Sequence, residues 1–460
     1  MKTKSTRGIW GSKLGFILAA SGSAIGLGNI WRFPTMTGEN GGAAFVLIYL
    51  GCVILIGVPV MIAELSMGRK AISDPVGAFK SLAPQTWWKA VGALGVLTGF
   101  MILSAYTVVA AWTLKYIFVT LTGQFYGLDQ ADIKRIFTDF IADGYSVIFY
   151  QFLIVATTIW IVRGGIRGGI EKATKILMPL MIVLLVLLVI RSVTLPGAHL
   201  GLSFYLTPDF SKVDSAVVGS ALGHAFFTLS LGMGAMITYG SYLGKDDNLV
   251  SSALYVSLAD TLIAFLAGFA IFPALFSVSG LSPAEGPGLI FLVLPNIFNA
   301  IPLGQLFGTI FFCLLAIAAL TSAISLLEVV VAYFIDQLGW QRKTTTLLVG
   351  SSAFLVGVPC ALSNGSIDRL SGLMDLVFLY FGEISLAVGA LFICVFVGWK
   401  WGIQNAVEEI HSGCPSFSQA PTWIFLVRYI CPLAIAVILS GYFKKPLAIL
   451  IDFSLSFFRT

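Results

Sequence analysis

Long apolar stretches recur along the chain, and the first of them is interrupted in its own middle. Residues 21–29, Ser-Gly-Ser-Ala-Ile-Gly-Leu-Gly-Asn, bring three glycines into a stretch that would otherwise continue as one helix. Glycine weakens a helix, and in lipid every carbonyl that a break exposes must find a partner in protein, water or an ion. The interruption therefore predicts a cation or substrate site inside the membrane. A small-residue helix contact between Gly22 and Gly26 is the alternative interpretation.

The composition places the chain among polytopic helical membrane proteins. Of its 460 residues, 58% are hydrophobic and only 11% are charged, which excludes a water-soluble globular protein. A helix needs about 20 residues to cross the hydrocarbon core, and eleven stretches are long enough to do so. They cover residues 12–36, 41–68, 90–118, 145–162, 174–194, 216–243, 250–276, 306–337, 345–362, 372–398 and 422–443.

The distribution of Lys and Arg predicts the orientation, because these residues are in excess on the cytoplasmic side of membrane proteins. With the amino terminus inside, sixteen of the 27 Lys and Arg residues fall on inner segments and nine on outer segments. The two others, Arg32 and Arg428, lie within spans. We therefore expect a multi-pass protein of the plasma (inner) membrane, with a cytoplasmic amino terminus and an extracytoplasmic carboxyl terminus. The net charge of +5 indicates topology and lipid contact, so no nucleic-acid partner is expected.

A second interruption lies half a chain later, in residues 223–234, where Gly232 and Gly234 fall inside the sixth span. Breaks at corresponding places in two halves of five spans are typical of inverted-repeat transporters, which bind substrate near the bilayer midplane. Close helix packing at the two glycines is the alternative. The predicted organisation is a cytoplasmic amino-terminal segment (1–11), a first repeat (12–195), an extracellular loop (196–215), an inverted second repeat (216–398), a cytoplasmic loop (399–421), span eleven (422–443) and a short tail (444–460).

Two hydroxyl groups and one carboxylate stand out among the apolar spans. Thr321 and Ser322 share a helix face with Ala318 in span eight, so their hydroxyls point the same way. Beside carbonyls exposed by the first break they would complete an oxygen cage for sodium, a hard cation; bonding back to their own helix is the alternative. Asp260 lies in span seven, where a carboxylate costs about 2.5–3.5 kcal/mol to insert. A bound cation, a proton or an interhelical hydrogen bond would compensate it.

These residues lead to a family resemblance. The chain resembles the neurotransmitter:sodium symporters, the family that includes LeuT, from about residue 7 through span eight and more weakly to residue 440. The matching motifs are residues 23–34, 39–42, 64–69, 204–209 and 226–230. The resemblance implies an all-α polytopic membrane protein with the LeuT fold, a 5+5 inverted repeat in which helices 1 and 6 are broken. Within the family it resembles bacterial transporters of hydrophobic or aromatic amino acids that have eleven transmembrane helices.

The resemblance further implies sodium-coupled import of an L-amino acid by alternating access, with two sodium ions. The first sodium site would consist of the substrate carboxylate, the Ala24 carbonyl and the side chains of Asn29, Thr228 and Asp260. The second sodium site would consist of the carbonyls of Gly22, Ile25 and Ala318 and the hydroxyls of Thr321 and Ser322. Because the substrate touches the first ion, binding of the two is coupled.

A substrate site follows from the same resemblance, with the Tyr106 hydroxyl facing the substrate carboxylate. Monoamine carriers of the family have an aspartate where this chain has Gly26, so a substrate with its own carboxylate is favoured. Met233 is flexible, which suits several large apolar side chains. The implied site residues are Ser23, Ala24, Gly26, Gly28, Ile102, Tyr106, Phe227, Thr228, Ser230, Met233, Ser322 and Leu326.

Two gates are also implied. On the outer side, Arg32 would close over Phe227, with Asp375 as the preferred acidic partner and Asp368 or Glu383 as competitors. The cytoplasmic gate would consist of Arg7, Asp336, Trp10 and Tyr242.

Chloride is not expected as a co-ion. Chloride-dependent relatives have serine where this chain has Ala264, and LeuT has asparagine where this chain has Asp260. Our hypothesis is that Asp260 supplies the fixed negative charge that chloride provides elsewhere.

The rival functions are a channel or substrate sensor with the LeuT fold, and a proton-coupled amino acid carrier. An enzyme is not expected, because the sequence contains no nucleophile motif, metal cluster or phosphate-binding loop. The expected partners are a small-molecule amino acid and the lipid bilayer. The sequence does not indicate an oligomeric state.

Overall fold

The computed structural model describes residues 8–278 and 289–442, and within these ranges the chain is helical and contains no strand. Nine helices of the described part are long and apolar enough to cross a membrane, and a bent pair at residues 13–39 forms a further span. The sixth predicted span falls on two shorter helices, α11 (Ser215–Thr228) and α12 (Ala235–Gly240). The all-helical LeuT-type architecture predicted from the sequence is confirmed.

The first repeat consists of spans one to five. Its helices are α1 (Lys13–Ala24), η1 (Gly28–Arg32) and α2 (Phe33–Glu39); α3 (Ala43–Cys52), η2 (Val53–Gly57) and α4 (Val58–Ala71); α6 (Lys89–Leu121); α8 (Gly144–Arg163); and η3 (Ile166–Glu171) with α9 (Lys172–Val193). The fifth span therefore begins eight residues before the predicted 174, because the π-helical η3 continues directly into α9.

The second repeat consists of spans six to ten and is followed by span eleven. Its helices are α11 and α12; α13 (Leu249–Phe276); α15 (Gly304–Leu338); α16 (Arg342–Leu362); and η6 (Asp368–Leu370), α17 (Leu373–Val377), η7 (Phe378–Ser385), α18 (Leu386–Val395) and η8 (Phe396–Lys400). Span eleven consists of α20 (Ala420–Phe425), η9 (Leu426–Ile430) and α21 (Cys431–Tyr442).

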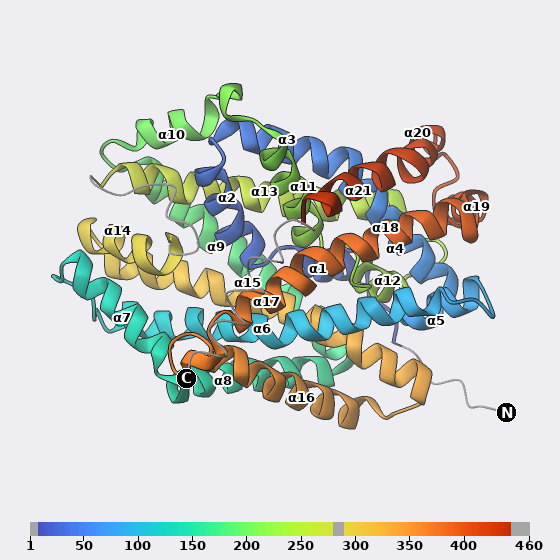
Figure 1. The fold of residues 1–460 in the computed structure, drawn as a ribbon, viewed down its shortest axis with the longest axis horizontal. Helices are drawn as coiled ribbons and strands as arrows, with labels where there is room; N and C mark the ends of the chain where they lie inside the picture. The colour runs from blue at the N-terminus through green and yellow to red at the C-terminus, as the bar shows by residue number, and fades with distance from the viewer. Residues whose placement is uncertain (1–7, 279–288, 443–460) are drawn as a thin grey trace.

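Shorter helices connect the spans. They are α5 (Pro75–Leu82), α7 (Gln130–Ala142), α10 (Ala198–Leu206), η4 (Phe210–Lys212), η5 (Leu289–Val293), α14 (Leu294–Ala300) and α19 (Ile403–Gly413). In Figure 1 the long helices run roughly horizontally, with α7, α10 and α14 at one end and α5 and α19 at the other. The segment 196–215 was predicted as a loop but contains the helix α10. The Tyr205 hydroxyl of α10 donates to the Phe265 carbonyl of α13 at 3.0 Å.

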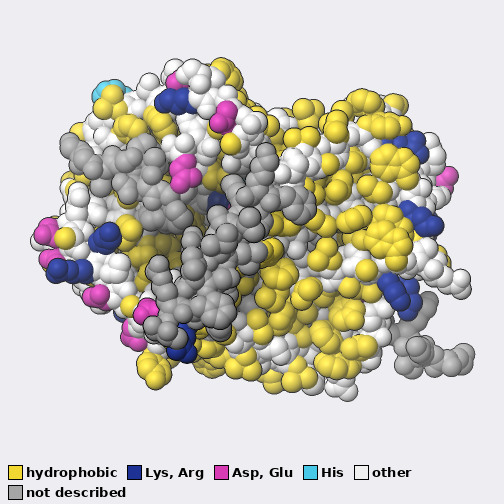
Figure 2. Space-filling model, viewed as in Figure 1, with side chains coloured by type: hydrophobic (Ala, Val, Ile, Leu, Met, Phe, Trp, Pro, Cys, Tyr) yellow, Lys and Arg dark blue, Asp and Glu magenta, His cyan; other side chains and the backbone are white. Residues whose placement is uncertain are grey.

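Apolar side chains cover the sides of the helix bundle. On the face shown in Figure 2 they form a broad band, and the charged side chains gather towards the two ends. Many large apolar residues of the spans are exposed, among them Ile54, Trp160 and Leu258 at 64%, 76% and 64%. In water this surface would be unfavourable, whereas in a bilayer it faces hydrocarbon.

The two interruptions are real breaks in helices. The chain bends by 51° between α1 and the following helical segment, and Ile25 has an extended backbone with φ −73° and ψ 108°. Between α11 and α12, Ser230, Gly232 and Gly234 all have positive φ, at +55°, +82° and +79°. A side chain at position 232 would also meet the Leu386 carbonyl of α18 at 2.0 Å, so this turn requires glycine.

Candidate functional site

A buried pocket lies between the two breaks. All twelve residues that the family resemblance implies for a substrate site line it, together with Ser325 and Leu386. The residues come from α1 and η1, α6, α11 and the turn after it, α15 and α18. The pattern of breaks thus brings together segments that are about 300 residues apart in the chain, from Ser23 to Ser322.

The polar side of this pocket is built from hydroxyl groups and the end of α1. The Ser230 hydroxyl donates to the Ser23 carbonyl at 2.9 Å, and the Ser322 hydroxyl lies 3.4 Å from the same oxygen. Tyr106 accepts a hydrogen bond from the Leu27 amide at 3.2 Å, which fixes the chain just after the break. Because the last four carbonyls of a helix lack amide partners within it, the end of α1 presents oxygen atoms to the pocket.

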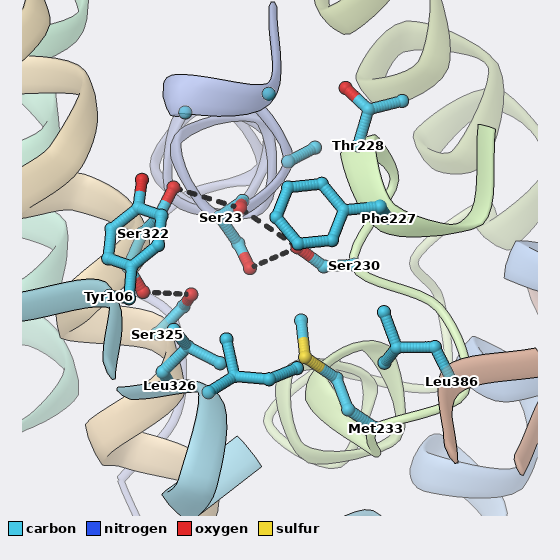
Figure 3. Close-up of a pocket in the computed structure, with 14 residues that line it drawn as sticks. Ser23, Tyr106, Phe227, Thr228, Ser230, Met233, Ser322, Ser325, Leu326 and Leu386 are labelled. Carbon is cyan, nitrogen blue, oxygen red and sulfur yellow. Dashed lines mark hydrogen bonds between the residues drawn. The ribbon is translucent and has the colours of Figure 1, made fainter. Parts of the chain in front are cut away.

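The opposite side of the pocket is apolar. Met233, Leu326 and Leu386 face the group of serine hydroxyls across the cavity (Figure 3). The cavity measures about 30 Å³, which is room for about two water molecules. A larger molecule therefore enters only when apolar lining residues move aside.

Asp260 is fully buried and sits at the centre of a hydrogen-bonded cluster. One carboxylate oxygen accepts from the Asn29 amide at 2.7 Å and from the Thr228 hydroxyl at 2.9 Å, and the other accepts from the Tyr49 hydroxyl at 3.2 Å. Asn29 in turn accepts the Gly26 amide at 2.9 Å. Three of the four residues predicted for the first sodium site are thus in direct contact, and the fourth, Ala24, ends the adjoining helix.

The residues predicted for the second sodium site also face one another. A side chain at Gly22 would lie 3.4 Å from Cβ of Thr321, so α1 and α15 approach closely here. The Ser322 hydroxyl lies 3.5 Å from the Ile25 carbonyl. The Thr321 hydroxyl donates to the carbonyls of Ile317 and Ala318 in its own helix, at 3.2 and 3.0 Å. This is the back-bonded arrangement that the sequence left open as an alternative.

The ion pair of Arg32 differs from the preferred prediction. Arg32 forms an ion pair with Glu383 at 2.5 Å, and its guanidinium lies 4.9 Å from the centre of the Phe227 ring. Asp375, the preferred acidic partner in the sequence, is exposed near the start of the tenth span. Glu383 lies within the π-helical η7, which begins after Val377 and changes the helix register, so that Glu383 faces Arg32. Asp368 lies in η6, at the start of the span.

The opposite closure is built around Trp10. Its indole nitrogen donates to the Tyr239 carbonyl at 3.1 Å, and its ring packs edge-on against Tyr242 at 6.1 Å. The Tyr242 hydroxyl donates to Glu328 at 2.7 Å, and Arg342 forms an ion pair with the other oxygen of that carboxylate. Two predicted residues, Trp10 and Tyr242, therefore belong to one network with a buried carboxylate.

The predicted pair of Arg7 and Asp336 is only partly placed, because Arg7 lies outside the described residues. Asp336 accepts the Asp74 amide at 2.8 Å, which ties the start of α5 to the end of α15. Burial raises the pKa of the Asp74 carboxyl, although hydrogen bonds from Gln337 and Gly77 oppose this shift.

The sequence reasoning missed several residues of the site. Glu64 and Glu328 are fully buried carboxylates inside spans, and Glu64 accepts the Gly232 amide at 2.7 Å, which supports the second break. Both could have been found by the signal that singled out Asp260, a carboxylate in an apolar stretch. Ser325 and Leu386 gave no such signal, because their part in the pocket depends on packing.

Comparison with known sequences identifies the family to which this chain is similar. A model of the sodium:neurotransmitter symporter family matches residues 7–129 and 136–450 of the chain. The sodium-dependent transporter YhdH of Bacillus subtilis is 40% identical over 93% of this chain and 96% of its own length. The sodium-dependent serotonin transporter of Drosophila melanogaster is 26% identical over 92% of this chain and 75% of its own length.

A solved structure is also similar. The crystal structure of MhsT in complex with L-phenylalanine superposes with a TM-score of 0.87 and 48% sequence identity. The match covers 95% of this chain and all of that one. The matched family and MhsT are transporters and not enzymes.

Proposed function

Because the chain belongs to the sodium:neurotransmitter symporter family and is therefore a sodium-dependent symporter, we propose that it imports hydrophobic or aromatic L-amino acids by alternating access. The observation that carries this proposal is the pocket between the two broken helices. Its polar side offers hydroxyls and helix-end groups to a charged amino acid backbone, and its other side is apolar. The phenylalanine bound to the similar structure supports the same substrate class.

The space around Gly26 supports a substrate that has its own carboxylate. A Cβ atom at this position would lie 2.4 Å from the Ser322 hydroxyl and 3.0 Å from the Tyr106 hydroxyl. A larger acidic residue here would displace both hydroxyls. The arrangement favours an amino acid, whose carboxylate takes the place beside Tyr106, over an amine without a carboxylate.

Two sodium ions accompany the substrate in this proposal. The first is held by the cluster of Asn29, Thr228 and Asp260 with the Ala24 carbonyl and the substrate carboxylate. The second lies between α1 and α15, where the Thr321 hydroxyl turns from its own helix to the ion, joining Ser322 and the carbonyls of Gly22, Ile25 and Ala318. The second ion holds α15 against α1, which stabilises the closed pocket.

Asp260 makes chloride unnecessary in this proposal. The carboxylate is fully buried and accepts hydrogen bonds from three side chains, and its charge balances the first sodium ion. We expect Asp260→Asn to weaken sodium binding by about tenfold or more, which corresponds to about 1.4 kcal/mol. The variant should also gain a dependence on chloride, whereas the wild type transports equally in sodium chloride and sodium gluconate. Asp375→Asn, which removes an exposed carboxylate, is the matched control.

The proposal includes an orientation of the protein in the membrane. Trp10 and the start of α1 lie on the cytoplasmic side, and the carboxyl end of α21 lies outside. The closure by Arg32 and Glu383 then faces outwards. A thiol reagent that does not cross membranes tests this when single cysteines are introduced at Lys80 and at Tyr145, two exposed residues at opposite ends of the bundle. Intact cells should react at position 145 only.

The test of function is uptake of labelled L-phenylalanine or L-leucine into proteoliposomes. An inward sodium gradient should drive saturable accumulation, and replacing sodium with potassium should abolish it. Competition by each of the twenty unlabelled amino acids should rank large apolar side chains first. Equal uptake in sodium and potassium would overturn the proposed coupling, and displacement by small or charged amino acids alone would overturn the substrate class.

A further inference from the structure

A second cavity lies away from the transport pocket, beside the start of α9. It measures about 440 Å³, a volume in the range of small-molecule sites. Its walls are formed by Gly11, Arg167, Glu171, Lys172, Lys175 and Ile176. None of these residues takes part in the pocket, the two predicted ion sites or the closures described above.

The charges around this cavity are unbalanced. Arg167, Lys172 and Lys175 face a single carboxylate, Glu171, which is 3% exposed. Lys175 is paired with Glu171 at 2.6 Å, and the other oxygen of Glu171 accepts the Gly11 amide at 2.6 Å. Among residues 8–278 and 289–442, no ion pair or hydrogen bond compensates the side-chain charges of Arg167 and Lys172. The cavity therefore presents two positive charges to whatever enters it.

The chain's own amino-terminal residues do not supply the missing negative charge. Residues 1–7 contain Lys2, Lys4 and Arg7 and no acidic residue. Because Arg167 and Lys172 are exposed at the cavity, both charges are accessible to an anion from outside this part of the chain.

The cavity adjoins a surface that faces lipid. Ile176, one of its walls, is 61% exposed. From this residue a row of exposed apolar side chains follows one face of α9 along the membrane span, with Leu180, Val183, Leu187 and Ile190. Their spacing of three and four residues keeps them on one side of the helix. An anion bound in the cavity thus lies at the end of an apolar strip.

We propose that this cavity binds the phosphate headgroup of an anionic phospholipid, whose acyl chains lie along the exposed face of α9. A phosphodiester charge compensates Arg167 and Lys172, and the apolar strip accommodates the attached chains. Basic pockets between transmembrane helices bind such headgroups through the same combination of charge and apolar contact. A free phosphate ion would use only the charged half of this site.

The proposal is tested with the purified full-length protein in a neutral detergent. Native mass spectrometry measures the binding of a phosphatidylglycerol with two oleoyl chains, of the matching phosphatidylcholine, and the competition by inorganic phosphate. We expect tight binding of phosphatidylglycerol, weak binding of phosphatidylcholine and no displacement by phosphate at equal concentration. The affinity for phosphatidylglycerol should also fall as the salt concentration rises.

The decisive variant is Arg167→Gln combined with Lys172→Gln, which leaves Lys175 paired with Glu171. It should lose about tenfold or more in affinity for phosphatidylglycerol. Lys80→Gln with Lys89→Gln is the control, because it removes two exposed positive charges from the same end of the bundle but outside the cavity. The control should bind as the wild type does.

Three results would overturn the proposal. They are equal loss of binding in the two double variants, unchanged binding in the cavity variant, or displacement of the lipid by inorganic phosphate. The last result would indicate a free-phosphate site. Lipid binding in detergent requires neither sodium nor an amino acid, so failure here is distinguishable from failure of the proposed transport function.

Discussion

The two closures above and below the transport pocket are built very differently. On one side, Arg32 and Glu383 form an ion pair whose side chains are 27% and 25% exposed. On the other side, Glu328 is fully buried and accepts hydrogen bonds from Tyr242 and Arg342. Exposed ion pairs are weakened by water and salt, whereas breaking a buried one leaves a charge without compensation. The side that carries Trp10 should therefore be the harder one to open.

The largest effect is expected from Glu328→Gln. This change leaves the Arg342 guanidinium without its carboxylate, and loss of one member of a buried pair costs about 3–5 kcal/mol. Because Arg342 is 24% exposed, we expect the lower end of this range for the free energy of unfolding in detergent. Hydrogen exchange in α12 should rise at the same time. The double variant with Arg342→Gln should be less destabilised than the single one; equal or greater loss would contradict the pairing argument.

A smaller effect is expected from Trp10→Phe. The substitution keeps an aromatic ring against Tyr242 and Phe16 but removes the indole donor to the Tyr239 carbonyl. Loss of a buried hydrogen bond costs about 1–2 kcal/mol. Hydrogen exchange should increase at residues 10–16 and in α12, and not at Arg32. A change of equal size on the Arg32 side would show that the two closures are not independent.

Glu383→Gln should affect stability still less, by at most about 1 kcal/mol, because the pair is partly exposed. Its effect should appear as faster hydrogen exchange in η1 and easier access to the pocket from the Arg32 side. High salt should reduce the difference from the wild type. A loss of stability as large as that of Glu328→Gln would remove the distinction between the two closures.

The smallest effect is expected from Asp375→Asn. This carboxylate is exposed and has no role in the ion pair of Arg32, so the change in unfolding free energy should stay within about 0.5 kcal/mol. Access to the pocket should equal that of the wild type. If Asp375→Asn opened the pocket as strongly as Glu383→Gln does, the assignment of Glu383 as the partner of Arg32 would be wrong.

The fold could be predicted from the sequence to a large extent, because membrane spans depend on local composition. Ten of the predicted spans begin within four residues of the observed helices, and both breaks lie where the glycines are. The start of the fifth span was missed because η3 is rich in glycine and charge, and its helical state depends on packing against the start of α1. The helix α10 was missed because its sequence has no clear periodicity.

Most residues of the site were implied by the family resemblance, and the residues alone predicted it only where a polar or charged group stands inside an apolar span. A carboxylate such as Asp260 must have partners in the membrane, so its burial follows from the sequence alone. The partner of Arg32 does not follow, because Glu383 lies inside a π-helix that begins after Asp375 and that the sequence pattern does not indicate. Ser325 and Leu386 depend on the same kind of packing detail. The roles of these residues in ion and substrate binding stay predictions for the experiments above.

The small size of the transport pocket has a consequence for measurements of selectivity. With about 30 Å³ available, an amino acid of the proposed class would have to push apart Met233 and its neighbours, and part of its binding free energy would be used for that rearrangement. A measured dissociation constant then reflects the favourable interaction with the walls minus the free energy needed to deform them. Two amino acids of unlike size can therefore share one dissociation constant while holding the walls apart to different extents. A comparison of dissociation constants alone therefore does not show which of the two fits the pocket better.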